Sequence, residues 1–325
     1  MKFPRRNFLH LAAGAAALSA MSRIARAQAY PSRPVRIVVG FPAGGALDTL
    51  ARLMGQWLSE RLGKPFVIEN RPGAGSNIAT EAVVRALPDG YTLLLASSSN
   101  AINATLYERL NFNFIRDITP VAGLEREPHF MLVNPSFPAR TVPEFITYAK
   151  ANPGKVSMAS AGIGSTPHLA GELFKVMTGV ELVHVPYRGG TQALADLIGG
   201  QVQVYFGLPS SCVEYVRASS LRALAVTTPS RSDALPSVPT MIEFVPGYEA
   251  ITWSGVGAPK NTPAEIITKL NREINAALAD TRMKAWLVDI GATALPGSSA
   301  NFGKLITEDT QKWAEVIKFA GIKAD

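Results

Sequence analysis

The residues best suited to chemistry lie where an apolar segment gives way to two adjacent glycines, Gly44 and Gly45, followed by Asp48. The apolar segment 35–39 predicts a strand, and apolar residues spaced along one face predict a helix over 50–62. Glycines at such a junction let backbone N–H groups approach a ligand at the positive end of a helix dipole. The segment is suited to an anion, although glycines between a strand and a helix often serve only to make the turn.

Five loops that follow expected strands share a composition rich in Gly, Ser, Thr and Asn. They are the segments 41–48, 73–77, 97–100, 162–166 and 187–191. In parallel sheets the carboxyl ends of the strands line the crevice where ligands bind, so we expect these loops to converge on one cleft. Backbone amides and hydroxyl groups suit a carboxylate or a phosphate. Five loops at corresponding positions favour ligand binding over turn formation alone.

Motifs for catalysis and cofactor binding are missing from the sequence. It has no G-x-S-x-G elbow, no H-E-x-x-H zinc motif and no phosphate-binding P-loop. Gly162 and Gly164 match the start of a dinucleotide fingerprint, but Pro167 occupies the third glycine position. We therefore expect no cofactor, no metal and no enzymatic activity. An enzyme that acts on a small organic acid in the same cleft is the alternative, and it would need a base together with a nucleophile or metal.

Four polar residues have both a structural and a functional interpretation. Asp48 is expected to cap its helix or hold the loop, and it could also order water. His168, at the start of an expected helix, is a candidate for the site, whereas His184 in an apolar strand favours a structural role. Arg188 either pairs with a carboxylate or is solvated.

The first 29 residues have the features of an export signal. Lys2, Arg5 and Arg6 precede an apolar run over 8–20 that is too short for a membrane span. The arginine pair resembles a twin-arginine signal, and general secretion remains the alternative. Small residues predict cleavage before Tyr30, so we expect a soluble periplasmic protein.

Charge and cysteine content exclude some classes of protein. The formal net charge of the chain is +7, and five of its basic residues lie in the segment 1–29, which contains no acid. The sequence pI of about 9.5 is therefore mostly a property of the leader, and no basic patch indicates nucleic-acid binding. Cys212 is the only cysteine, so an intramolecular disulfide is impossible.

Alternating strand and helix patterns predict an α/β fold with largely parallel sheets. The expected strands are 35–39, 66–69, 91–95, 130–133, 155–158, 182–185, 202–205 and 221–226. The expected helices are 50–62, 78–86, one after Pro143, 168–177, one from Thr191 to the glycines at 199–200, 263–279, 283–290 and 302–317. The segment Thr262 to Glu265 predicts a capping box. The segment 228–247, rich in Pro and Ser, predicts a long ordered loop or a connection between domains.

Motifs along the whole mature chain resemble those of Bug-type solute receptors, the extracytoplasmic substrate-binding proteins of tripartite tricarboxylate transporters. They are Y-P-S-R-P at 30–34, F-P-A-G-G at 41–45 with Asp48 and Arg52, E-N-R-P-G-A-G at 69–75, H-L-A-G-E-L-F at 168–174, V-P-Y-R-G at 185–189, G-G-Q-V at 199–202 and L-A-V-T at 224–227. Together these motifs are specific to the family.

The resemblance implies a two-lobed periplasmic-binding-protein fold, similar to type II, with the ligand cleft between the lobes. We expect residues 30–128 and 252–325 to form the first lobe and residues 129–251 the second. In the family, two loops grip one ligand carboxylate, and more variable loops meet its far end. The matching residues are Phe41, Ala43, Gly44, Gly45 and Asp48 in the first loop, Tyr187, Gly189, Gly190 and Thr191 in the second, and Ser97, Ser98, Asn100, Gly164, Ser165, Thr166 and His168 at the far end.

The resemblance also implies a monomeric periplasmic receptor that binds a small mono- or dicarboxylate and delivers it to a membrane permease. A receptor that reports its ligand to a membrane sensor is the alternative. Many relatives carry an acidic residue where this chain has Gly207. An ammonium group is costly to bury unless an anion meets it. We therefore expect amino acids to bind more weakly than carboxylates of the same length without the amine. The alternative is that the acid of the relatives only shapes the loop.

Overall fold

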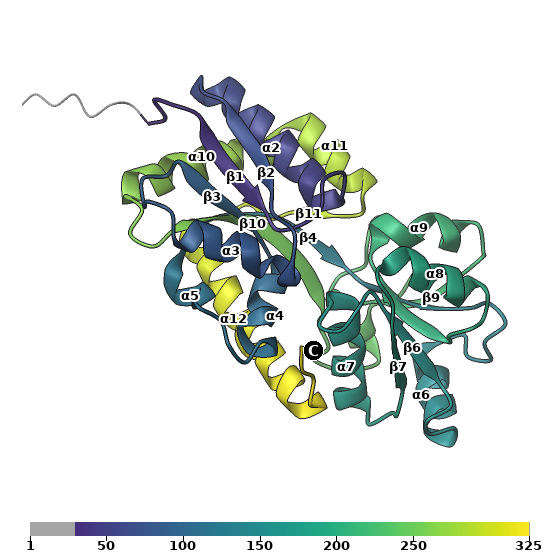
Figure 1. Cartoon of the computed structure of the whole chain (residues 1–325). Helices are drawn as coiled ribbons and strands as arrows, with labels where there is room; N and C mark the ends of the chain where they lie inside the picture. The colour runs from purple at the N-terminus through teal and green to yellow at the C-terminus, as the bar shows by residue number, and fades with distance from the viewer. Residues whose placement is uncertain (1–29, 325) are drawn as a thin grey trace, which may run out of the picture.

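The computed structural model describes residues 30–324, so the expected signal peptide at 1–29 lies outside the described part of the chain. In that part, two β-sheets form the frameworks of two lobes, and helices pack on both faces of each sheet (Figure 1). The predicted α/β, two-lobed fold is confirmed.

The first lobe is built on a six-stranded sheet with the order β11-β4-β10-β3-β1-β2. Its strands are β1 (Val35–Val39), β2 (Phe66–Asn70), β3 (Thr92–Ser97), β4 (Ile118–Pro128), β10 (Ile251–Pro259) and β11 (Thr293–Ala294). β1 pairs in parallel with β2 and β3, whereas β10 is antiparallel to β3 and β4. The carboxyl ends of the first three strands therefore meet at one edge of the sheet.

The second lobe is built on a five-stranded sheet with the order β7-β6-β8-β5-β9. Its strands are β5 (Phe130–Val133), β6 (Ser157–Ser160), β7 (Val183–Pro186), β8 (Val204–Gly207) and β9 (Arg222–Val226). β6 is parallel to β7 and β8, and β5 is antiparallel to β8 and β9. The loops that follow β6, β7 and β8 thus leave the same edge.

Each lobe has its own set of helices. The first carries α2 (Ala46–Leu62), a 3₁₀ turn η1 (Ala74–Ser76), α3 (Asn77–Val84), α4 (Ser98–Leu106), α5 (Phe114–Asp117), α10 (Ala264–Ala279), α11 (Thr281–Asp289) and α12 (Ser299–Ala320). The second carries α6 (Val142–Ala151), α7 (Thr166–Thr178), α8 (Gly190–Ile198), α9 (Pro209–Arg217) and a 3₁₀ turn η2 (Met241–Glu243). The expected strands and helices are present with shifts of a few residues at their ends, whereas α4, α5 and α9 are additional.

Both sheets are mixed, so the expectation of largely parallel sheets is only partly right. β4 and β10, the two long strands at which the chain leaves and re-enters the first sheet, are not among the strands predicted from the sequence. Both strands are buried along most of their length on both faces. Such strands lack the alternation of apolar and polar residues by which a half-buried strand is recognised.

The expected capping box at Thr262 is also wrong. α10 begins at Ala264 after Pro263, without a side-chain cap, and Thr262 Oγ1 donates instead to Pro259 O at 2.7 Å. The threonine hydroxyl therefore closes the turn before the helix. The loop expected at 228–247 is confirmed as mostly irregular, with η2 as its short helical turn.

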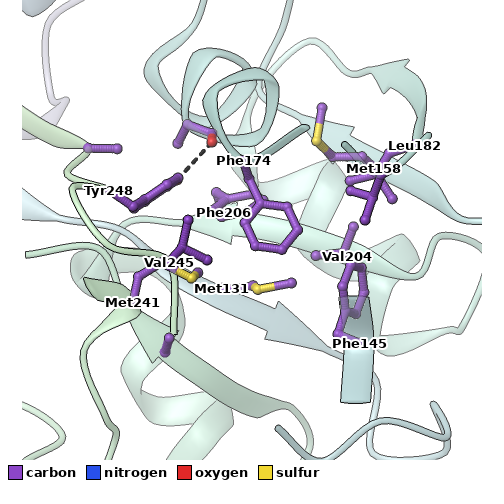
Figure 2. Close-up of a cluster of buried hydrophobic side chains, with 14 of the residues drawn as sticks. Met131, Phe145, Met158, Phe174, Leu182, Val204, Phe206, Met241, Val245 and Tyr248 are labelled. Carbon is purple, nitrogen blue, oxygen red and sulfur yellow. Dashed lines mark hydrogen bonds between the residues drawn. The ribbon is translucent and has the colours of Figure 1, made fainter. Parts of the chain in front are cut away.

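The second lobe has a dense apolar core, part of which is drawn in Figure 2. Met131, Phe174 and Phe206 pack between the second sheet and α7. Tyr248 is fully buried in this core, and its hydroxyl donates to Ala170 O at 2.7 Å. That hydrogen bond satisfies the one polar atom of its side chain.

Helix α12 belongs to the cores of both lobes. Phe302 and Ile306 pack with residues of the first sheet, whereas Trp313 and Val316 belong to the core cluster of the second lobe, which also includes Ile102 and Leu106 of α4. Between these two contacts, Trp253 Nε1 donates to Asp309 Oδ2 at 2.8 Å and fixes the helix to β10. The lobes are therefore joined by α12 as well as by the two chain crossings.

The chain crossings are hydrogen-bonded to each other. His129, the single residue between β4 and β5, donates its backbone N–H to Thr227 Oγ1 at 2.7 Å. Thr227 Oγ1 in turn donates to Ala250 O, next to the start of β10. Burial lowers the pKa of His129 to about 4, so the imidazole is neutral at neutral pH.

Candidate functional site

The loop between β1 and α2 is held by Asp48. Its Oδ2 accepts from Gly44 N at 2.8 Å, and Arg52 donates to both carboxylate oxygens at 2.9 and 3.0 Å. Asn70 at the end of β2 donates to Asp48 Oδ1 and also to Phe41 O. The hydrogen bond from Arg52, more than any other contact, lowers the pKa of Asp48 to about 2. Asp48 is thus a charged brace for the loop, and its charge is matched by Arg52.

The remainder of this loop is open to solvent. Ala43, Gly44 and Gly45 are exposed, and α2 starts at Gly45 without a side-chain cap. Gly44 has φ +85°, a left-handed backbone conformation that favours glycine. The first N–H groups of a helix have no intrahelical acceptor, so this uncapped end presents amides that an anion can occupy.

A second uncapped helix end follows β7. α8 starts after Gly189, which has φ +150°, and no side chain caps it. Tyr187 donates its hydroxyl to Asp196 Oδ2 at 2.6 Å and so ties the loop to the helix that follows. Arg188 and Thr191 are exposed, and a side chain at Gly190 would meet the Tyr205 hydroxyl.

The segment 97–100 is the end of β3 and the first turn of α4, where the sequence analysis expected a loop. Asn100 Oδ1 accepts from Ser97 N at 2.8 Å, and its Nδ2 donates to Thr80. Ser98 Oγ accepts from Trp253 N at 2.9 Å. The side chains of Ser98 and Asn100 are therefore committed to the fold. Ser99, which the sequence analysis left out, is the partly exposed residue of this turn.

The loop after β6 is organised around the start of α7. Ser165 accepts from His168 N, and Gly164 N donates to His168 Nδ1 at 3.1 Å. Gly164 has φ +72°, and a side chain there would collide with Leu106 at the end of α4. This loop of the second lobe thus lies against a helix of the first.

His168 and His184 form a stacked pair, with ring centroids 3.7 Å apart and planes 9° from parallel. His184 Nε2 lies 2.6 Å from Ser160 Oγ. Burial, with a smaller contribution from His168, lowers the pKa of His184 to about 4. His168 is 3% exposed, so it braces the loop from within.

Strand β10 brings two of the expected loops together. Trp253 N contacts Ser98 at the start of α4, and Thr252 Oγ1 donates to Thr166 Oγ1 at 3.0 Å at the start of α7. The 187–191 loop joins them, because Tyr187 N donates to Ser160 O at the end of β6. The 41–48 and 187–191 loops lie at the edges of different sheets, and within residues 30–324 no hydrogen bond links them.

Two acidic residues missed by the sequence analysis lie beside this region. Glu125 and Glu127 of β4 are 4% and 7% exposed. Burial raises the pKa of Glu125 above its ordinary value, and burial together with the charge of Glu125 raises the pKa of Glu127. The sequence feature that could have identified them is a pair of acids, two residues apart, inside the mostly apolar stretch 118–133.

The described residues 30–324 contain no cluster of three or more His, Cys, Asp and Glu side chains arranged to hold a metal. In the same residues, no helix has the length and apolar character needed to cross a bilayer.

The chain matches known proteins over most of its length. Residues 50–322 match the model of the tripartite tricarboxylate transporter family receptor. Protein BugT of Bordetella pertussis is 37% identical over 300 residues, which cover 91% of this chain and 92% of BugT. A UPF0065 protein of Pseudomonas sp. strain P51, from the tcbD-tcbE intergenic region, is also 37% identical, over 91% of this chain and 89% of its own.

Solved structures show the same fold. Rpa4515 of R. palustris, solved with adipate, has a TM-score of 0.79 and 38% identity, covering 90% of this chain and 99% of its own. MatC of Rhodopseudomonas palustris, solved with bound malate, has a TM-score of 0.75 and 32% identity, covering 89% and 100%. On the family match and these relatives, the chain belongs to the tripartite tricarboxylate transporter receptor family and is a Bug-type receptor.

Proposed function

We propose that this protein is a periplasmic receptor that binds a small mono- or dicarboxylate between its lobes and delivers it to a membrane permease. The observation that carries the proposal is the pair of uncapped helix ends at Gly45 and Gly189, one in each lobe. The helices α3, α9 and α10 also start without a side-chain cap, but among the α-helices of residues 30–324 only α2 and α8 have glycine at the N-cap position. A carboxylate that accepts from the free amides of both lobes would hold the lobes together.

The solved relatives support the ligand class. Rpa4515 was solved with adipate and MatC with malate, both of which are dicarboxylates. We assign the grip on one carboxylate to Phe41, Ala43 and Gly45 with Gly189, Gly190 and Thr191. A bracing role is assigned to Asp48, to Gly44, whose N–H donates to Asp48, and to Tyr187. Ser99, Gly164, Ser165 and Thr166 are assigned to the far end of the ligand, and Ser97, Ser98, Asn100 and His168 to its support.

The remaining features of the proposal follow from the family. We infer that residues 30–128 with 252–325 and residues 129–251 move as the two lobes, although the second half of α12 also packs on the second lobe. The receptor works as a monomer after cleavage before Tyr30, and it releases its ligand unchanged.

Thermal denaturation in the presence of single organic acids tests the function. A ligand that binds only the folded state adds RT ln(1 + [L]/Kd) to the free energy of unfolding, so a bound acid raises Tm. Sugars and metal cations serve as controls. A rise in Tm with a sugar or a cation and with no acid would contradict the proposal.

Gly45→Val tests the location of the grip. Gly45 has φ −78° and ψ 170°, an extended conformation open to any residue, so the variant should fold normally. Its branched side chain would cover the amides at the start of α2, and we expect the acid-induced rise in Tm to disappear. Ala151→Val, at an exposed position at the far end of α6, is the matched control and should retain the rise.

A further inference from the structure

Glu125 and Glu127 lie on the face of the crossing strands that meets the candidate ligand loops. In the antiparallel pair β4–β10, Glu125 is opposite Ser254 and Glu127 is opposite Thr252. Directly opposed residues of such a pair point to the same face. Thr252 on this face donates to Thr166 Oγ1 at the start of α7. The two carboxyl groups therefore lie beside the loops of the proposed cleft.

The two carboxyl groups have hydroxyl neighbours and no cationic partner. Ser254 Oγ donates to Glu125 Oε1 at 2.6 Å. The Ser210 hydroxyl at the start of α9 interacts with Glu127 and lowers its pKa, against the larger effect of burial. Glu125 Oε2 and Glu127 Oε1 are buried and without a hydrogen-bond partner among residues 30–324. Arg126 between them is exposed, and no ion pair in the described chain includes either glutamate.

Among residues 30–324, the titratable neighbours Cys212 and His129 supply no positive charge. Besides Ser210, α9 places Cys212 near Glu127, and burial raises the pKa of this thiol, so it stays neutral. His129, which contacts Thr252, is neutral as well. Two carboxylates buried side by side without a cation are unstable as ions, so they must either hold protons or receive a positive group from outside the fold.

We propose that Glu125 and Glu127 form a subsite for a protonated amine of the ligand, so that the preferred ligand is an amino acid or another carboxylate that carries an ammonium group. The oxygens without partners would accept from the ammonium N–H groups, and its charge would offset theirs. This inference rests on the proposed function and reverses the expectation drawn from Gly207.

Calorimetric titration with matched ligand pairs tests the subsite. The pairs are succinate with aspartate, glutarate with glutamate, and butyrate with 4-aminobutyrate. We expect one amine-bearing member to bind about 30-fold or more tightly than its partner, the range set by losing one side of a buried charge pair. Amine-free acids that bind equally or more tightly in every pair would overturn the inference and leave the carboxylate receptor intact, whereas binding by neither class would overturn both.

Glu125→Gln and Glu127→Gln keep the shape of each side chain and remove its charge. Either variant should lose most of the preference for the amine and bind the amine-free acid at least as tightly as the wild type. Glu214→Gln, an exposed acid on α9, removes the same charge away from the subsite and should change nothing. An unchanged preference in both subsite variants would overturn the inference.

A measurement on the unmodified protein keeps the test independent of how the variants fold. An ammonium group that displaces protons from the two carboxyl groups releases them to the buffer. Titrations near neutral pH, in buffers that differ in ionisation enthalpy, should show proton release with the amine-bearing ligand and none with its amine-free partner. Equal proton release by both ligands would contradict the subsite.

Discussion

At the scale of single residues, the site depends on which neighbouring groups balance the negative charge of each carboxyl group. Asp48 receives hydrogen bonds from Gly44, Arg52 and Asn70, and its pKa falls to about 2. Glu125 and Glu127 have hydroxyl partners only, and their pKa values rise. A carboxylate thus holds a loop in place at Asp48, whereas the carboxyl groups of Glu125 and Glu127 have no cationic partner among the described residues.

The buried glutamates make a prediction about stability and pH. A carboxyl group whose pKa is higher in the folded state binds more protons there than in the unfolded state, so stability falls as the pH rises above the ordinary glutamate pKa. Glutamine resembles the protonated acid. We expect Glu127→Gln to increase the free energy of unfolding relative to wild type at about pH 8 and much less at about pH 5. Urea denaturation at both values measures the difference, and a gain that does not depend on pH would contradict it.

Asp48 makes a prediction about affinity. Asp48→Asn loses the charge-assisted contacts with Arg52 and loosens the loop that presents the amides of Gly45 and its neighbours. We expect carboxylate affinity to fall about tenfold, as for the loss of one such contact. Isothermal titration provides the measurement, and the exposed Asp233→Asn is the control. Wild-type affinity in Asp48→Asn would show that the loop does not depend on this brace.

At the scale of elements, α12 determines how strongly the lobes are coupled. Trp313 is fully buried in the core cluster of the second lobe, which also includes residues of α4, although α12 begins in the first lobe. Trp313→Ala should lower the free energy of unfolding by about 3–5 kcal/mol, the usual cost of removing a large aromatic side chain from a core. Phe319→Ala, on the same helix but 74% exposed, should have little effect. Equal losses in the two variants, measured by urea denaturation, would show that the helix does not join the lobes through Trp313.

The same scale shows what the sequence could predict. Helices such as α2 and α7 were found because their buried faces repeat with the helical period, and β1 and β5 because they are short apolar runs. β4 and β10 were missed because both of their faces are buried, and with them the position of Glu125 and Glu127. The glycine-rich loops predict the candidate site, and its location stays a prediction. Whether the side chains of Ser98, Ser99 and Asn100 point inward or outward depends on α4, and a loop was expected at this position from the sequence.

At the scale of the whole molecule, two lobes with uncapped helix ends meet at hydrogen-bonded crossing strands (Figure 1). In the proposed receptor, a ligand that contacts both lobes holds them together, and it need only be bound, not changed. The residues that carry charge in this region brace loops or await a partner, in keeping with a receptor that releases what it binds.

Native mass spectrometry of the mature protein with single organic acids tests the central claim most directly. The account predicts a 1:1 complex whose mass exceeds that of the free protein by one intact carboxylate, with the acid recovered unchanged after denaturation. Gly45→Val measured under the same conditions should show the free protein only. A chemically altered acid after incubation, or a complex formed with a sugar or a metal cation and with no acid, would contradict the account.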